Sequence, residues 1–195
     1  MLPESGYTRK NPFPAILTVN RRLTTEASGK ETRHLEISIS GSGLNYEVGD
    51  SVGVVPSNPP ELVELIHAEL GLAGTAEVPT PEGELVPLRE ALLKNFVITE
   101  PSKQLLQAVS EKDPSGKFLA ALLEPSANAE LTKFLWGRDL LDVLQEFPAA
   151  RFTPEEFVKT LRKLQPRLYS IASSQKAVGE SVHLTVAVVR YGVKH

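Results

Sequence analysis

The chain has 195 residues, of which 41% are hydrophobic and 23% charged, which predicts a soluble globular protein of one domain, or of one domain with a large insertion. The net charge of −3 gives no reason to expect nucleic acid or an anionic membrane as a partner, and the absence of cysteine excludes disulfides and thiolate sites. No apolar run approaches the roughly 20 residues of a membrane span and no signal-peptide core is present, so we expect a cytoplasmic protein.

The first part of the chain, residues 1–57, is predicted to be β-structure. In its second strand Leu35, Ile37 and Ile39 alternate with polar residues, which is typical of a half-buried antiparallel strand. His34, on the polar face, is interpreted as a solvent-facing residue rather than a ligand. Strands are expected over residues 14–24, 33–40 and 51–55.

A change of character at residue 58 predicts a helical region that extends to residue 165. Asn58 as the N-cap, Pro59 at the first helical position and Glu61 at the third form a helix start, and Gly71 predicts the helix end. A capping box opens the last helix. Further helices are expected over residues 88–95, 102–110, 116–123, 129–136, 138–146 and 154–164.

Polar and aromatic residues of the helical region have structural interpretations. Asp139 and Asp142 are expected to be acidic residues of a first helical turn rather than a catalytic pair. His67 lies off the apolar stripe of its helix and is expected to face solvent. Trp136 is expected to be a packing anchor.

The most informative segment is Arg-Leu-Tyr-Ser-Ile-Ala-Ser-Ser at residues 167–174, which follows a helix stop at Gln165-Pro166 and is predicted to be a strand. Alternation places Arg167 and Tyr169 on one face and Ser170 on the other. A planar cation, an aromatic ring and a hydroxyl suit a ligand with a diphosphate, a ring system and a polar ring atom. The same residues also fit an ordinary strand with a surface arginine and a half-buried tyrosine. A further strand is expected over residues 181–191.

The segment that begins at Arg167 resembles the Arg-x-Tyr-Ser flavin-binding signature of the ferredoxin–NADP reductase-like flavoproteins. The longer match is to their diflavin branch, in which the motif residues of the sulfite reductase flavoproteins are the most similar. Three further segments agree with this resemblance in the expected order, at residues 33–37, 46–54 and 183–191.

The resemblance implies a β barrel plus an α insertion: a six-stranded antiparallel FAD-binding barrel of the ferredoxin-reductase type, interrupted by an all-helical connecting domain. The first barrel strands are expected at residues 1–57, the connecting insertion at 58–165, and the strands with the flavin motif at 166–195. Only five barrel strands are counted. We therefore expect a fragment that lacks the last strand, the pyrophosphate loop and the NADPH-binding domain.

The resemblance also implies FAD as the cofactor and assigns roles to the motif. Arg167 is expected to hold the pyrophosphate, Tyr169 to stack on the isoalloxazine ring, and Ser170 to act beside the flavin N5 as the catalytic residue. The next strand is expected to supply main-chain contacts and an aromatic platform for the adenine. The other cofactor-binding residues that the resemblance implies are Leu168, Thr185, Val186, Ala187, Tyr191 and Thr99.

The parent protein implied by this resemblance passes electrons from NADPH through FAD to FMN and on to an acceptor such as a sulfite reductase haemoprotein. Its partners are a flavodoxin-like FMN domain and an NADPH-binding domain, and no metal is expected. The fragment alone is expected to be inactive. The alternative is a non-catalytic module whose helices dock a partner while the strands serve as a scaffold.

Overall fold

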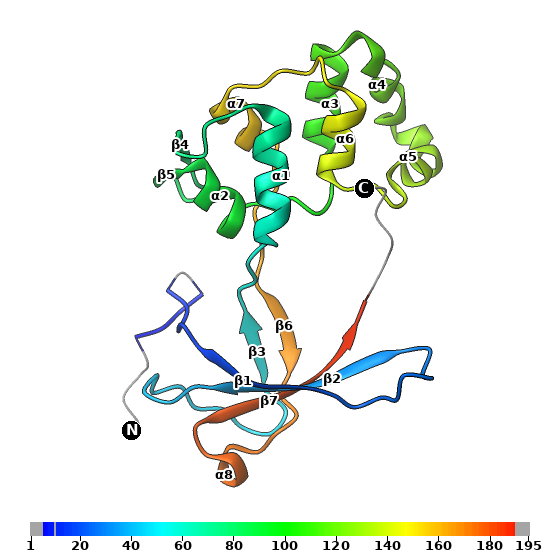
Figure 1. Ribbon diagram of the computed structural model, residues 1–195. Helices are drawn as coiled ribbons and strands as arrows, with labels where there is room; N and C mark the ends of the chain where they lie inside the picture. The colour runs from blue at the N-terminus through cyan, green and yellow to red at the C-terminus, as the bar shows by residue number, and fades with distance from the viewer. Residues whose placement is uncertain (1–5, 10, 190–195) are drawn as a thin grey trace. The chain divides into compact units, whose positions relative to one another are not determined.

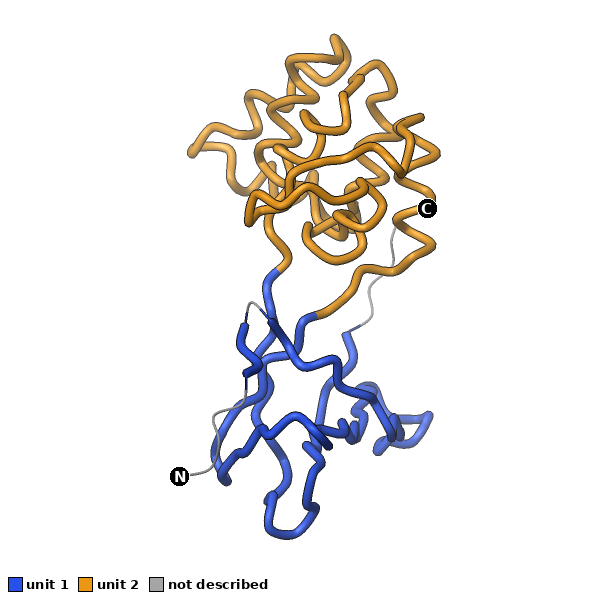
Figure 2. Tube along the Cα trace, turned by 90° about the vertical axis from the view of Figure 1, so that its left-hand side faces the viewer, with its two compact units in different colours: residues 1–55, 165–190 blue, residues 56–164, 191–195 orange. Residues whose placement is uncertain are grey.

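The computed structural model describes residues 6–9 and 11–189, which form two compact units (Figures 1 and 2). The β unit contains residues 6–55 and 165–189, and the helical unit contains residues 56–164. The chain therefore leaves the β unit after its third strand and returns to it just before Arg167.

The β unit consists of two small antiparallel sheets and one short helix. All five strands predicted for this part of the chain are present. Within the described residues the sheets do not close into a barrel, so the six-stranded barrel stays a prediction. The three-stranded sheet has the order β1 (Ile16–Arg22), β2 (Glu31–Ser38), β7 (Ser181–Val188); the other sheet pairs β3 (Ser51–Val54) with β6 (Arg167–Ser170), and the helix is α8 (Gln175–Val178).

The predicted alternation of β2 builds the core of the β unit. Leu35 lies opposite Leu184 and Ile37 opposite Val182 across the β2–β7 ladder. Val182 and Leu184 are buried together with Ile39, and the apolar face of β2 packs against them. Burial of one such side chain contributes about 1.5–3 kcal/mol to the stability of the folded state. Because this core is small, the hydrogen-bonded strand ladders around it also support the β unit.

The helical unit contains the larger core, to which most of its helices contribute buried leucine and valine side chains. The predicted helices are all present, although the last is shorter than expected. Their bounds are α1 (Pro60–Leu70), α2 (Leu88–Lys94), α3 (Lys103–Lys112), α4 (Phe118–Leu122), α5 (Asn128–Leu135), α6 (Leu140–Glu146) and α7 (Pro154–Lys159), with single 3₁₀ turns at Pro114–Gly116 and Pro125–Ala127.

Several helix ends follow the local signals of the sequence. Gly71 ends α1 in the left-handed region at φ 62°, which a residue without Cβ adopts at little cost. Thr153 opens α7 with a capping box, and Asp139 and Asp142 form another at α6. The two aspartates are therefore helix-start residues, as predicted.

The structure corrects the prediction of an all-helical insertion. A short antiparallel hairpin, β4 (Glu77–Pro79) and β5 (Leu85–Pro87), lies between α1 and α2. Strands of three residues are too short to show a clear period of two in sequence. Its Val78 is fully buried in the helical core, which explains why the hairpin belongs to this unit.

Three single-residue predictions in the helical unit are also wrong. Asn58 does not cap α1: it is buried, and its amide donates to the carbonyls of Leu92 and Phe96 at 2.6 and 2.7 Å. His67 is buried rather than solvent-facing, since α1 packs against both α2 and α6. Trp136 is 82% exposed and therefore anchors no packing within this unit.

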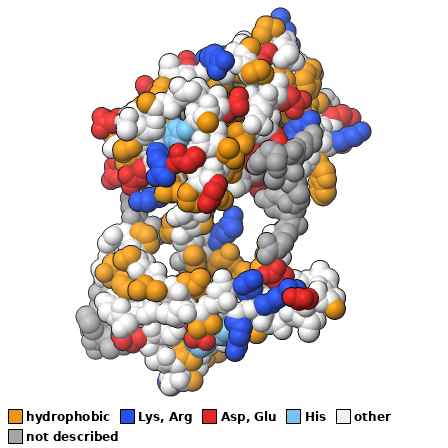
Figure 3. All heavy atoms as spheres, viewed as in Figure 1, with side chains coloured by type: hydrophobic (Ala, Val, Ile, Leu, Met, Phe, Trp, Pro, Cys, Tyr) orange, Lys and Arg blue, Asp and Glu red, His pale blue; other side chains and the backbone are white. Residues whose placement is uncertain are grey.

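On the face of the helical unit that Figure 3 shows, acidic and basic side chains lie mixed with hydrophobic ones. Ion pairs join several of them, including Arg89 with Glu64 at 2.6 Å and Arg162 with Glu100 at 2.7 Å. These pairs are exposed, so each contributes little to stability. In the described part of the chain, no helix has the length and apolar character required to cross a bilayer.

Candidate functional site

The motif that begins at Arg167 forms β6, which pairs with β3 in an antiparallel ladder. Tyr169 lies opposite Val52 and Arg167 opposite Val54, so these four residues share one face. The predicted alternation is confirmed, because Ser170 lies on the other face of the strand.

The side chains of β6 differ in exposure. Arg167 and Ser170 are exposed, and Leu168 is 77% exposed. Arg167 belongs to no ion pair within residues 6–9 and 11–189, so its guanidinium is free to meet an anion. Tyr169 is half-buried and packs beside Val52 against the core of the β unit, so only part of its ring is open to a ligand.

Main-chain hydrogen bonds show which edge of β6 is open. The N–H of Ile171 donates to the carbonyl of Asp50 at 2.9 Å, on the side of β3. Successive residues of a strand direct their N–H and C=O groups to opposite edges. The main-chain groups of Leu168 and Ser170 therefore point away from β3, toward an edge that no other strand of the described chain occupies.

β7 has a matching open edge. The carbonyl of His183 accepts from the N–H of Ala172 at 2.8 Å, and the N–H of His183 donates to the Ser173 hydroxyl at 3.1 Å. Both partners lie on the side away from β2. By the same alternation, the main-chain groups of Thr185 and Ala187 also point away from β2.

The two open edges begin at one point and then separate. The bond from Ala172 to His183 joins the end of β6 to β7, and from there the strands diverge (Figure 1). The diverging edges present the main-chain groups of Leu168 and Ser170 on one side and those of Thr185 and Ala187 on the other. We use the term open edges for five residues: Leu168 and Ser170 of β6, Thr185 and Ala187 of β7, and Arg167.

Three other predicted residues have different positions. Val186 packs against the core, and its main-chain groups point into the β2 ladder, so its predicted cofactor contact has less support than those of its neighbours. Thr99 is half-buried in a bend of the helical unit, and its role stays a prediction. Tyr191 lies outside the described residues.

A polar network that the sequence did not reveal supports the site. Tyr46 donates to the carbonyl of Ser181 at 2.7 Å, and its oxygen lies 2.7 Å from the Ser173 hydroxyl. The N–H of Tyr46 donates to the side-chain oxygen of Gln175 at 2.9 Å. Tyr46, Ser173 and Gln175 all lie in or next to segments quoted for the resemblance, which was the available signal.

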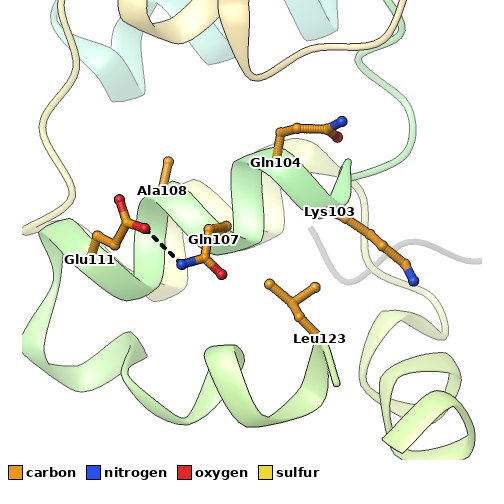
Figure 4. A pocket seen from close by; sticks show the side chains of 6 residues that line it. All are labelled: Lys103, Gln104, Gln107, Ala108, Glu111 and Leu123. Carbon is orange, nitrogen blue, oxygen red and sulfur yellow. Dashed lines mark hydrogen bonds between the residues drawn. The ribbon is translucent and has the colours of Figure 1, made fainter. Parts of the chain in front are cut away.

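The shallow groove found in the helical unit contains none of the predicted site residues (Figure 4). Its walls come from α3 and from Leu123, and the Gln107 amide in it donates to Glu111 at 2.7 Å. It therefore belongs to the surface of the helical unit and not to the open edges.

Comparison with known proteins decides the family. A family model described as FAD binding domain matches residues 6–195. The chain belongs to the FAD binding domain family. FAD is therefore the cofactor of this domain, and the exposed guanidinium, the half-buried aromatic ring and the free main-chain groups at the open edges fit such a ligand.

Three relatives of this FAD binding domain carry the name sulfite reductase (NADPH) flavoprotein alpha-component. The protein from Bacillus subtilis (strain 168) is 44% identical over 190 residues, which cover 96% of this chain and 31% of the relative. That from Aliivibrio fischeri is 40% identical over 187 residues, 96% of this chain and 30% of the relative. The protein from Neisseria meningitidis serogroup B is 39% identical over 192 residues, which cover 97% of this chain and 30% of the relative. The chain thus spans about 31% of the relatives' length.

Proposed function

We propose that the chain is the FAD-binding part of an NADPH-dependent diflavin reductase of the sulfite reductase flavoprotein type. The observation that carries this proposal is the pair of open edges, where main-chain groups of β6 and β7 have no strand partner in the described chain and lie next to an exposed arginine and a half-buried aromatic ring. The family of the chain and the name of these relatives support the same function.

Each residue of the site receives a role in this proposal. Arg167 holds the pyrophosphate through bidentate hydrogen bonds, since its guanidinium is exposed and has no acidic partner in the described chain. Tyr169 stacks against the isoalloxazine with the part of its ring that the core leaves open. Ser170 presents its hydroxyl and its N–H beside N5. Thr185 and Ala187 donate and accept through the main chain of the edge of β7.

FAD supplies the redox chemistry when it is bound, accepting a hydride and releasing single electrons. The chain's own contribution is to bind and orient the ring system. The half-buried Tyr169 holds one ring face away from water, and Ser170 supplies a hydrogen-bond partner at a fixed position on the rigid β3–β6 ladder.

The whole-protein part of the proposal goes further. NADPH delivers the hydride, FMN in a flavodoxin-like domain takes the electrons, and a haemoprotein is the acceptor, all in the cytoplasm. The β unit belongs to a six-stranded barrel in that protein, and the helical unit is its connecting domain. Leu168 of β6 and Thr99 of the helical unit are lesser proposed contacts to the cofactor. The alternative of a partner-docking module has support from the exposed Trp136.

The test is a fluorescence titration of the chain with FAD. Arg167→Ala removes charged hydrogen bonds worth about 1.5–3 kcal/mol, so the dissociation constant should rise roughly 10- to 100-fold. Arg151→Ala is the matched control, because Arg151 is an exposed arginine of the helical unit. If the Arg167→Ala and Arg151→Ala variants bind FAD equally tightly, the open edges are not the site.

A further inference from the structure

Three polar side chains gather on the sheet face that is opposite to the core of the β unit. His34 and Glu36 are two residues apart on β2, so they point the same way, and Leu35 points into the core. His183 lies directly opposite Glu36 on β7. Two imidazoles and one carboxylate, from segments far apart in the sequence, therefore meet on one face.

The ladder brings these side chains unusually close. Because the main-chain groups of His183 point away from β2, Glu36 and His183 form a pair without mutual main-chain hydrogen bonds. In such pairs the Cα atoms approach to about 4.5 Å, and the side chains are nearer than in hydrogen-bonded pairs. His34 forms a pair of the same type with Thr185, which lies opposite it on β7.

The distances suit a shared ion. His34 Nε2 lies 3.0 Å from Glu36 Oε1, and His183 Nε2 lies 3.8 Å from Glu36 Oε2. One nitrogen or oxygen from each residue lies within 4.8 Å of the others. Zinc bonds of about 2.0–2.2 Å in a tetrahedral site place neighbouring ligand atoms roughly 3.3–3.6 Å apart. Binding of the ion therefore requires side-chain rotations that bring the three ligand atoms closer together.

We propose that His34, Glu36 and His183 bind one divalent transition-metal ion of the zinc type, with water at the fourth position. Imidazole nitrogen selects zinc, copper and nickel, whereas magnesium prefers oxygen ligands. The three side chains are only 18%, 31% and 20% exposed, which reduces the competition from solvent. His34 lies on the polar face of β2, as predicted, but its side chain is half-buried rather than solvent-facing.

One neighbouring charge opposes the ion. Arg21 lies opposite His34 on β1, and its positive charge repels a cation. Arg21 is exposed, so solvent and salt screen this repulsion, while the carboxylate oxygens of Glu36 lie 3.0 Å from His34 Nε2 and 3.8 Å from His183 Nε2. The balance favours binding.

An ion at this position joins β2 to β7, the strand that carries Thr185 and Ala187. A ligand that binds only the folded state raises the melting temperature, and the rise grows with the logarithm of the free ligand concentration above the dissociation constant. Zinc should therefore stabilise the β unit, and it should do so in the absence of FAD. The outcome is thus independent of the proposed flavin function.

The experiment is a titration of the metal-free chain with Zn²⁺, read by calorimetry and by thermal melting. We expect one Zn²⁺ per chain and a rise in melting temperature that Mg²⁺ does not produce. His34→Gln, His183→Gln and Glu36→Gln should each weaken Zn²⁺ binding by about tenfold or more. Glu47→Gln, which neutralises an exposed carboxylate of the same unit, should bind Zn²⁺ as the parent does.

Melting and circular dichroism without metal show which variants are folded, and the Zn²⁺ affinities of the folded variants are then compared with that of the parent. The proposal is overturned if the chain takes up no Zn²⁺ at millimolar concentration. It is equally overturned if the folded His34→Gln and Glu36→Gln variants bind Zn²⁺ as tightly as the parent, because the ion then sits elsewhere.

Discussion

The phenol oxygen of Tyr46 and the hydroxyl of Ser173 lie 2.7 Å apart, and this contact joins the approach to β3 with the segment that follows β6. Because the Tyr46 proton goes to the Ser181 carbonyl, the Ser173 proton goes to Tyr46. The Ser173 oxygen then accepts the N–H of His183. Each polar atom of this group has a partner, so the group holds the start of β7 against β6.

Tyr46→Phe should destabilise the β unit. The change leaves the Ser173 hydroxyl and the Ser181 carbonyl without their partner, and an unsatisfied polar group in a partly buried position costs about 1–3 kcal/mol. Urea denaturation measures this loss. Tyr169→Phe is the matched control, because the Tyr169 hydroxyl has no hydrogen bond in the described part of the chain; equal stabilities for the two variants would contradict the role of the network.

Tyr169→Ala should lower both FAD affinity and stability. The ring packs against the core of the β unit and is also proposed to stack on the flavin, where stacking is worth about 0.5–1.5 kcal/mol beyond burial. FAD affinity should fall about tenfold or more, and the melting temperature without FAD should also fall. Tyr169→Phe should change neither quantity strongly.

The Tyr169 measurements separate the two roles of the ring. Titration with FAD reports the stacking contact, and melting without flavin reports the core contact. An alanine variant that melts early and yet binds FAD as the parent does would assign Tyr169 to the core alone.

Asp113→Asn should reduce the acid sensitivity of the helical unit. The Ser115 hydroxyl, which donates to the carboxylate at 2.6 Å, holds the pKa of Asp113 below its ordinary value, with the N–H groups of Ser115 and Ala149 acting the same way against the opposing effect of burial. A depressed pKa in the folded state contributes stability above the ordinary pKa. That stability is lost as the pH falls below about 4 and through the depressed value.

Urea denaturation between neutral pH and pH 3 checks the role of Asp113. The parent should lose stability steeply at the acidic end, whereas Asp113→Asn should lose less over the same interval. Ser115→Ala removes the main cause of the depressed pKa and should give an intermediate slope. Parallel curves for the parent and Asp113→Asn would refute this account.

Asn58→Ala should destabilise the helical unit by about 1–3 kcal/mol, because the carbonyls of Leu92 and Phe96 then lose their donor in a buried position. Asn58→Asp should cost more, since a carboxylate would face two carbonyl oxygens. Asn45→Ala is the control, because Asn45 is exposed. Denaturation that shows no difference between Asn58→Ala and Asn45→Ala would contradict the anchoring role.

Local patterns in the sequence determined much of this protein. The period of two in Leu35 and Ile37 predicted β2 and its buried face, Gly71 predicted the end of α1, and Thr153 predicted the start of α7. These signals work because near neighbours in the chain decide strand alternation and the pairing of helix-end hydrogen bonds. The flavin motif was also visible, since it occupies one short strand.

Only the tertiary structure decided where distant segments meet. Asn58 is a residue type typical of N-caps, but its amide donates instead to the carbonyls of Leu92 in α2 and of Phe96, two residues beyond the end of that helix. Trp136 has the size of a core residue, yet no element packs over it within its unit. The pairing of Glu36 with His183 and the open edges at Ser170 and Thr185 likewise follow from the strand register. Register depends on long-range packing and not on adjacent residues, so the sequence alone does not reveal it.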